Sequence, residues 1–179
     1  MTLRDRPPYR ADHVGSLLRP KDLLDARERK ARGEIDRAAL RAVEDRAIAD
    51  AVKFQQDIGL KAITDGEYRR TYFHIDFLEQ LEGVTVSGGI GTKFHTAKGE
   101  VDFAPPRLEV SGKLRHVKPI QVEDFSYLKS VVKRGTPKVC IPSPTMVHFR
   151  GGRDAISKEA YPEIEGFFED LAACYRKEL

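Results

Sequence analysis

Two carboxylates lie close together in a segment whose position suits binding or catalysis. Asp65 and Glu67 flank a glycine directly after the apolar run 60–64, which we predict to be a buried strand. In parallel α/β proteins ligands gather at the carboxyl ends of strands, so a carboxylate there can bind a substrate ammonium group or act as a base. The alternative is an ordinary loop whose acids pair with Arg69 and Arg70, and spacing alone leaves both open.

A second candidate site lies where the apolar segment 9–18 meets its loop. Gly15 and Ser16 can offer backbone N–H groups and a hydroxyl to a carboxylate or phosphate, and His13 lies beside them. The alternative is a tight turn in which Ser16 caps the next helix. The histidines of the chain show no HxH or HxxxH spacing, so the sequence predicts no zinc site from neighbouring residues.

A third candidate follows the apolar run 138–141, the second predicted buried strand. Ser143, Pro144 and Thr145 come directly after Pro142, and proline restricts both itself and the residue before it. The strand exit should therefore be extended and rigid, which suits a wall beside a flat ligand and equally an ordinary loop. The sequence contains no GxGxxG, P-loop or GxSxG motif, which argues against nucleotide binding and serine hydrolysis.

Helices must connect these strand candidates. Apolar spacing and end signals predict helices from Pro20 to Gly33, from an Asp36 cap to a Gly59 stop, over 122–132, and from Ser157 onwards. The expected apolar faces include Phe54 and Ile58 of the second helix and Phe168 of the last.

Residues 83–116 show a different pattern, with alternating segments broken by turns. This pattern predicts an inserted β-hairpin excursion in which His95 and His116 are exposed. The order of elements is then βα, βα with the insertion, and βα. Helical crossovers between short apolar strands are typical of a parallel sheet, so we predict an α/β fold of about three βα units.

Length and composition limit the possible architectures. The 179 residues suffice for one domain, whereas a complete (β/α)₈ barrel needs at least about 200. Charges are interleaved, 31 basic against 28 acidic, which does not indicate a nucleic-acid surface. No apolar run reaches membrane-spanning length and no signal sequence is evident, so we expect a cytoplasmic protein. Cys140 and Cys174 are expected to be reduced core thiols.

Three segments together resemble the cobalamin-independent methionine synthase superfamily, and in particular its short, single-barrel branch. They are RADHVGSLLRP at 10–20, ITDGEYRR at 63–70 and PSPT at 142–145. The resemblance spans essentially the whole chain. It implies a (β/α)₈ barrel that transfers a methyl group from methyltetrahydrofolate to the thiol of homocysteine, with zinc holding the thiolate.

The resemblance also implies roles for individual residues. Gly15 and Ser16 would bind the amino-acid carboxylate, and Glu67, next to Asp65, would bind the ammonium group. Ser143, Pro144 and Thr145 would lie on the folate side. The zinc ligands of the family belong to later strands and have no counterpart here, so residues 1–179 would be the N-terminal part of one barrel, with neither a metal ligand nor a catalytic residue.

One departure from the family pattern keeps other functions open. The pair Asp12 and His13 before Gly15 is foreign to the full methionine synthase pattern, so His13 could accompany another substrate. A related zinc-dependent thiol alkyltransferase with another donor or acceptor is the first alternative. The second is a catalytically incomplete fragment that needs a homo-oligomer or a complementing C-terminal half, because an open parallel sheet exposes edges and apolar faces.

Overall fold

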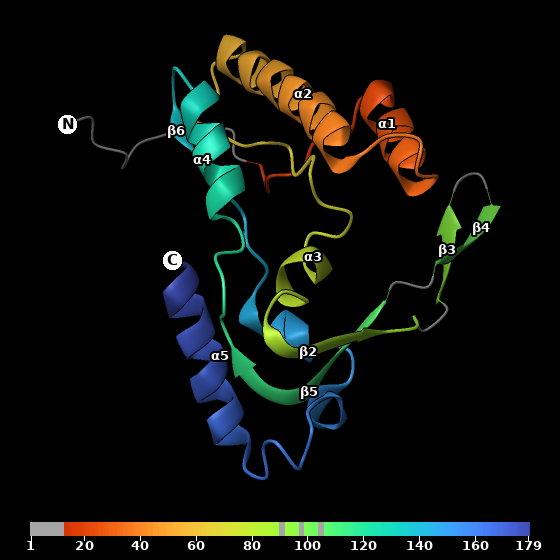
Figure 1. The fold of residues 1–179 in the computed structure, drawn as a ribbon, viewed down its shortest axis with the longest axis vertical. Coiled ribbons are helices and arrows are strands. Elements are labelled where there is room, and N and C mark those ends of the chain that lie inside the picture. Colours follow the sequence, from red (N-terminus) through yellow and green to blue (C-terminus); the bar gives the residue numbers. More distant parts are fainter. Residues whose placement is uncertain (1–12, 90–91, 97–98, 104–105) are drawn as a thin grey trace. The chain divides into compact units, whose positions relative to one another are not determined.

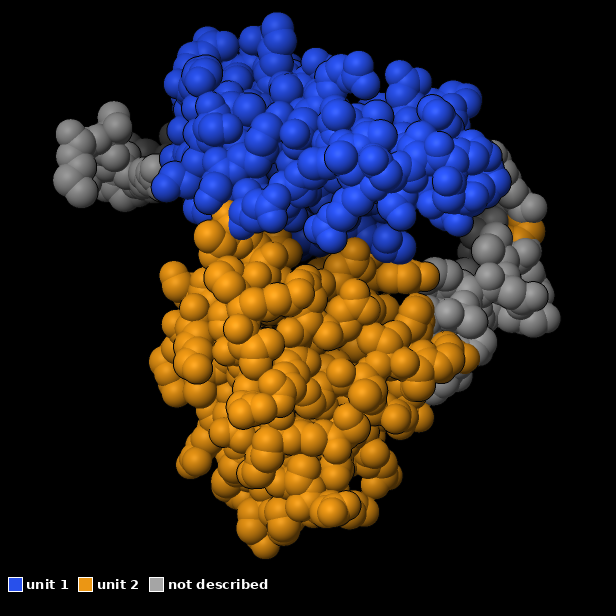
Figure 2. All heavy atoms as spheres, in the orientation of Figure 1, with its two compact units in different colours: residues 1–71, 123–140 blue, residues 72–122, 141–179 orange. Residues whose placement is uncertain are grey.

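The computed structural model describes residues 13–89, 92–96, 99–103 and 106–179. The chain divides into two compact units, residues 1–71 with 123–140 and residues 72–122 with 141–179 (Figure 2). Helices alternate with small two-stranded sheets, so the expectation of a mixed α/β protein is confirmed. Within the described ranges, no helix combines the length and apolar character needed to cross a membrane.

The first unit is built on the packing of α1 against α2 (Figure 1). Its elements are α1 (Lys21–Ala31), α2 (Arg37–Asp57), β1 (Ala62–Ile63), α4 (Val122–Val131) and β6 (Thr136–Pro137). The first residue of α4, Val122, belongs to the second unit. Its core consists of Leu23, Ile48, Ala51, Val52, Ile63, Tyr68 and Leu128. The core therefore reaches from both helices to the segment that follows β1.

The ends of α2 agree with the sequence prediction. The Asp36 carboxylate accepts the Ala39 N–H at 2.7 Å, which satisfies one of the unpaired donors of the first turn. At the other end, Gly59 takes a φ of +81°, a left-handed conformation that glycine adopts without steric cost. Local signals therefore determine both ends.

The predicted buried face of α2 is partly wrong. Phe54 and Ile58 are exposed, with 59% and 57% of their surface accessible. The polar side chains of Glu44 and Gln55 are buried instead. Each has a partner in a distant segment, Arg69 for Glu44 and the Thr64 backbone for Gln55, which the periodicity of one helix cannot reveal.

The first predicted buried strand is present and the second is displaced. β1 pairs in parallel with β6, with Ala62 opposite Thr136. The expected strand at 138–141 is wrong, because the ladder ends where Lys138 donates its N–H to the Ile63 carbonyl at 2.8 Å and the chain after β1 turns away. Of the segment 9–18, residues 9–12 lie outside the described residues, and Ser16 makes a single parallel bridge to Gly66.

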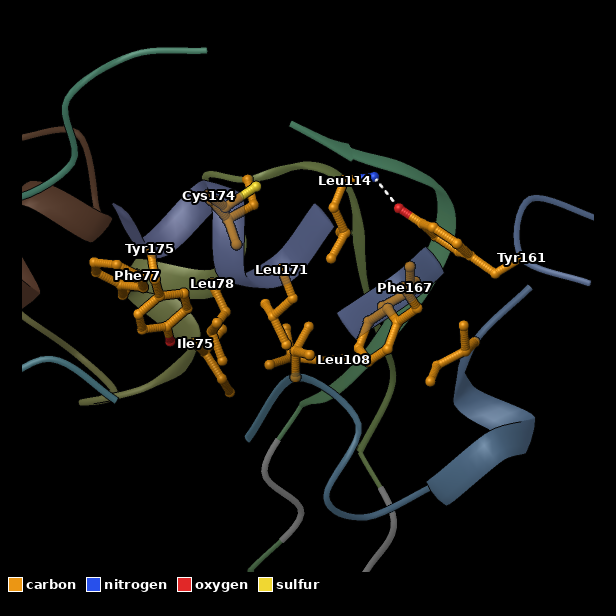
Figure 3. Packing of buried hydrophobic residues seen from close by; sticks show 14 residues of the cluster. Ile75, Phe77, Leu78, Leu108, Leu114, Tyr161, Phe167, Leu171, Cys174 and Tyr175 are labelled. Atoms are coloured by element: carbon orange, nitrogen blue, oxygen red, sulfur yellow. Dashed lines mark hydrogen bonds between the residues drawn. The ribbon is translucent and has the colours of Figure 1, made fainter. Parts of the chain in front are cut away.

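The second unit packs α5 against a curved antiparallel strand pair (Figure 3). Its elements are α3 (Ile75–Leu78), β2 (Glu82–Ser87), β3 (Thr92–Thr96), β4 (Gly99–Phe103), β5 (Arg107–Arg115), the 3₁₀ turns η1 (Pro144–Val147) and η2 (Gly152–Ala155), and α5 (Ile164–Glu178). β2 pairs with β5 and β3 with β4. Tyr161 joins the layers, since its hydroxyl accepts the Leu114 N–H and donates to Asp170, and burial raises its pKa to about 12.

Two expectations for the second unit are wrong. Phe168 is 47% exposed, whereas its neighbour Phe167 is fully buried and packs in the core with Leu171 and Tyr175. His116 is not exposed: its Nε2 lies 2.6 Å from the Glu178 carboxylate, and both side chains are buried. The side chain of His95 lies outside the described residues.

Candidate functional site

The turn after β1 holds a glutamate in an unusual backbone conformation. Gly66 and Glu67 have φ angles of +68° and +56°, and Glu67 is the one non-glycine residue of the described chain with positive φ. The Glu67 N–H donates to Asp65 Oδ1 at 2.9 Å, and the Glu67 carbonyl accepts the Arg70 N–H at 3.1 Å. Left-handed non-glycine residues are costly and collect at functional sites, so this turn is the leading candidate.

The side chain of Glu67 is buried. The residue is 6% exposed, and its Oε1 lies 3.7 Å from Arg70 Nη1. That distance gives an ion pair rather than a hydrogen bond, so it compensates the buried charge and leaves carboxylate lone pairs for a further donor. The sequence alternative in which both arginines pair with this turn is half correct, because Arg69 instead contacts Glu44, Asp45 and Asp124.

Gly15 lies directly against this carboxylate. It is buried with a φ of +150°, and a Cβ added there would lie 2.9 Å from Cys140 Sγ and 3.1 Å from Glu67 Oε1. The Gly15 carbonyl accepts the Thr64 hydroxyl at 2.7 Å. Only glycine leaves enough room for this close approach of backbone and carboxylate.

Ser16 continues the same contact and does not cap a helix. The Leu17 N–H donates to the Gly66 carbonyl at 3.0 Å, which fixes the segment beside the turn. α1 has Pro20 at its N-cap with no side-chain hydrogen bond, and Ser16 is exposed. The capping alternative is therefore wrong, and the Ser16 hydroxyl faces solvent next to Gly15.

His13 lies at the edge of this group of residues. Its Nε2 is 3.3 Å from the Ala62 carbonyl, and its own carbonyl accepts a hydrogen bond from Lys138 Nζ. The ring is thereby tied to β1. The structure thus brings five predicted residues together within the first unit: His13, Gly15, Ser16, Asp65 and Glu67.

Two supporting residues had no sequence signal as members of the site. Cys140 packs on Gly15 and donates its thiol to the Val14 carbonyl. Burial raises the pKa of Cys140, and the ammonium of Lys138 opposes that effect, so the thiol is a neutral packing group at neutral pH. Gln55 binds the Thr64 backbone in both directions, accepting its N–H at 3.0 Å and donating to its carbonyl at 2.8 Å.

Ser143, Pro144 and Thr145 belong to the second unit. All three are exposed, and the hydroxyls of Ser143 and Thr145 lie 2.9 Å apart. Ser143 has the extended conformation expected before proline, but Pro144 starts η1 instead of continuing an extended path. The buried Tyr175 donates its hydroxyl to the Pro142 carbonyl at 2.9 Å, which anchors the segment.

The described side chains do not fit a metal centre. Across the part of the chain that the structure describes, no three His, Cys, Asp or Glu side chains gather to hold an ion. Cys140 and Cys174 are both free cysteines. The site offers a buried carboxylate, a close backbone approach and a hydroxyl, which suits recognition of a small charged molecule.

Comparison with known proteins gives a consistent set of relatives. The uncharacterized protein YxjH of Bacillus subtilis is 39% identical over 175 residues, which is 97% of this chain and 45% of YxjH. Methionine synthase of Sulfolobus acidocaldarius is 28% identical over 131 residues, 73% of this chain and 37% of that protein. No family model matches the chain.

A solved structure shares the fold. A candidate vitamin-B12-independent methionine synthase from Listeria monocytogenes superimposes with a TM-score of 0.74 and 38% identity. The match covers 95% of this chain and 46% of that one. The chain therefore spans less than half the length of the relatives that it matches.

Proposed function

Because the chain belongs to the cobalamin-independent methionine synthase superfamily, we propose that it supplies the amino-acid-binding part of a methyltransferase. The full reaction would move a methyl group from methyltetrahydrofolate to the thiol of homocysteine. Residues 1–179 would form about three βα units at the N-terminal side of a (β/α)₈ barrel, with 83–116 as an excursion from it. A complementing C-terminal half would supply the rest.

The arrangement of the first unit supports binding of an α-amino acid. The Glu67 carboxylate would accept hydrogen bonds from the ammonium group, and charge-assisted bonds of this kind are the strong ones. The backbone N–H groups at Gly15 and Ser16, with the Ser16 hydroxyl, would bind the carboxylate. Asp65 holds the Glu67 N–H, and so orients the turn rather than touching the ligand.

The remaining parts of the reaction involve groups outside this arrangement. Ser143, Pro144 and Thr145 would lie beside the folate, as exposed hydroxyls and a rigid proline allow. The zinc of the family finds no fitting ligand set in the described residues. We therefore derive no step through zinc, and expect its ligands in the complementing half.

One observation carries the proposal: a buried carboxylate on a strained left-handed residue, 3.1 Å from the position of a Gly15 Cβ. Strain is kept where it serves a site, and the absence of a side chain at Gly15 brings backbone donors and carboxylate within reach of one small ligand. A purely structural turn would gain nothing from a buried acid that its arginine partner does not hydrogen-bond.

Calorimetric binding of L-homocysteine to the 179-residue chain tests the proposal. The matched probe is 4-mercaptobutanoate, which lacks only the amino group. We expect the chain to prefer homocysteine, and Glu67→Gln to weaken homocysteine binding by more than about tenfold while leaving the probe unaffected. Glu165→Gln, on the exposed face of α5, is the control and should change neither affinity. Equal affinity of the wild-type chain for both compounds would refute the proposal.

A further inference from the structure

The turn that carries Glu67 is held by two guanidinium groups from outside it. Arg19 Nη2 donates to the Glu67 carbonyl at 3.2 Å and to the Arg70 carbonyl at 2.6 Å. Arg27 Nη2, from α1, donates to the Tyr68 carbonyl at 2.5 Å. Three carbonyls of residues 67–70 thus face two cations, an arrangement that we call the guanidinium clamp.

The Arg19 part of the clamp does not serve an ion pair. In the described part of the chain, Arg19 forms no salt bridge with an acid, and its buried Nε has no hydrogen-bond partner. A partly buried cation without a carboxylate is costly. The side chain of Arg19 hydrogen-bonds the carbonyls of Glu67 and Arg70, so the effect of these bonds on the turn best explains where this cation lies.

The contact is reciprocal. The Tyr68 hydroxyl donates to the Leu18 carbonyl at 3.0 Å, directly before Arg19. The segment before α1 and the turn therefore hold each other by side-chain bonds in both directions. Since Gly15 and Ser16 lie in the same segment, the clamp also fixes the separation between these backbone groups and Glu67.

This geometry bears on the strained residue. A φ of +56° at Glu67 is unfavourable for a side chain larger than glycine, and such a conformation persists when its surroundings fix it on several sides. Asp65 fixes the Glu67 N–H and Arg19 fixes its carbonyl. Both peptide groups that flank the Glu67 Cα are thereby held, which fixes the direction in which the side chain leaves the backbone.

We propose that Arg19 is a positioning residue for the ligand ammonium group: by bonding the carbonyls of Glu67 and Arg70, it holds Glu67 left-handed with its carboxylate toward Gly15. This rests on the proposed function for the identity of the ligand, but not for the effect on the turn. Specificity for α-amino acids over their deaminated analogues would then depend on a residue that does not touch the ligand.

Arg19→Met and Arg19→Lys test this proposal, with Arg46→Met on the exposed face of α2 as the control. The first readout is amide hydrogen exchange at Glu67, with the Thr64 amide, bonded to Gln55, as the internal reference for the fold. In Arg19→Met, exchange at Glu67 should accelerate by about tenfold or more while Thr64 is unchanged. Arg19→Lys keeps a cationic donor but lacks the rigid planar guanidinium and its reach, so its exchange rate should lie between those of Arg19→Met and the wild-type chain.

The second readout is the affinity ratio of L-homocysteine to 4-mercaptobutanoate. The ratio should fall by about tenfold in Arg19→Met and stay at the wild-type value in Arg46→Met. If exchange at Glu67 is the same in Arg19→Met and Arg46→Met, the proposal is overturned. If Thr64 also loses protection in Arg19→Met, the fold has failed, and the Lys variant decides by the same criterion.

The two readouts separate this proposal from the one on which it rests. A wild-type chain that shows no preference for the amino group refutes the proposed function, and the exchange data still decide whether Arg19 holds the turn. A wild-type preference that survives in Arg19→Met, with Glu67 exchange also unchanged, refutes only the role of Arg19.

Discussion

Gly15→Ala should be unusually costly for a glycine substitution. Its φ of +150° falls in a region that side chains rarely adopt, which we estimate at about 1–3 kcal/mol. The new Cβ would also lie 2.9 Å from Cys140 Sγ and 3.1 Å from Glu67 Oε1. Overpacking of this kind adds about 1–3 kcal/mol, so the total loss in free energy of unfolding should be about 2–6 kcal/mol.

A matched glycine separates the two contributions. Gly33 also has a left-handed φ, +74°, but a Cβ there would meet no atom within 4 Å. Gly33→Ala should therefore cost about 1–2 kcal/mol, the backbone contribution alone. Cys140→Ala removes the nearer clashing atom, so Gly15→Ala with Cys140→Ala should recover about 1 kcal/mol or more relative to the sum of the single changes.

Urea unfolding followed by circular dichroism measures these differences, and exchange at the Thr64 amide reports on the first unit alone. Homocysteine binding should be lost in Gly15→Ala and retained in Gly33→Ala. The reasoning fails if Gly15→Ala costs no more than Gly33→Ala. It also fails if Cys140→Ala does not couple to Gly15→Ala, because the steric argument requires these two residues to interact.

Two further predictions concern the buried charges behind the turn. Arg69→Met should destabilise the chain by about 3–5 kcal/mol in urea unfolding, because the Arg69 side chain is 4% exposed and its loss removes the ion-pair partner of the buried Glu44, whereas Asp124 keeps Arg41. A loss below about 1 kcal/mol would contradict this. Burial raises the pKa of Glu44 above its ordinary 4.5 despite the opposing effect of Arg69, so its favourable contribution is complete below pH 4.5 and is lost as pH rises through the folded-state value. Between pH 4.5 and the raised pKa of Glu44, the free energy of unfolding should therefore decline more with pH for the wild-type chain than for Glu44→Gln. Identical pH profiles of the two chains would refute the raised pKa of Glu44.

Local signals in the sequence predicted local structure well. Asp36 and Gly59 act within one turn of their own positions, so the ends of α2 could be predicted. The side that a helix buries depends on its partners, and for that reason Phe54 and Phe168 were misplaced. The strand expected at 138–141 failed similarly, because pairing partners and not apolar composition decide where a strand ends.

The same distinction between local signals and distant partners applies to the residues of the candidate site. Asp65 and Glu67 could be predicted because two acids after a short apolar run carry their own signal. Arg19 and Cys140 could not, because each acts on backbone groups 48 to 126 residues away in sequence. Neither residue type is unusual at its position, and only the folded chain shows that both support Gly15 or Glu67.

The distance between Glu67 and Arg70 explains how one buried carboxylate could serve both the fold and a ligand. A hydrogen bond from Arg70 would stabilise Glu67 more, but it would occupy part of the lone-pair capacity that an ammonium group could use. At 3.7 Å the guanidinium still offsets the charge of the carboxylate, and binding would not have to break a strong existing bond. Arg19 donates to the Arg70 carbonyl as well as to that of Glu67, so one guanidinium contacts the backbone from which both members of the ion pair extend.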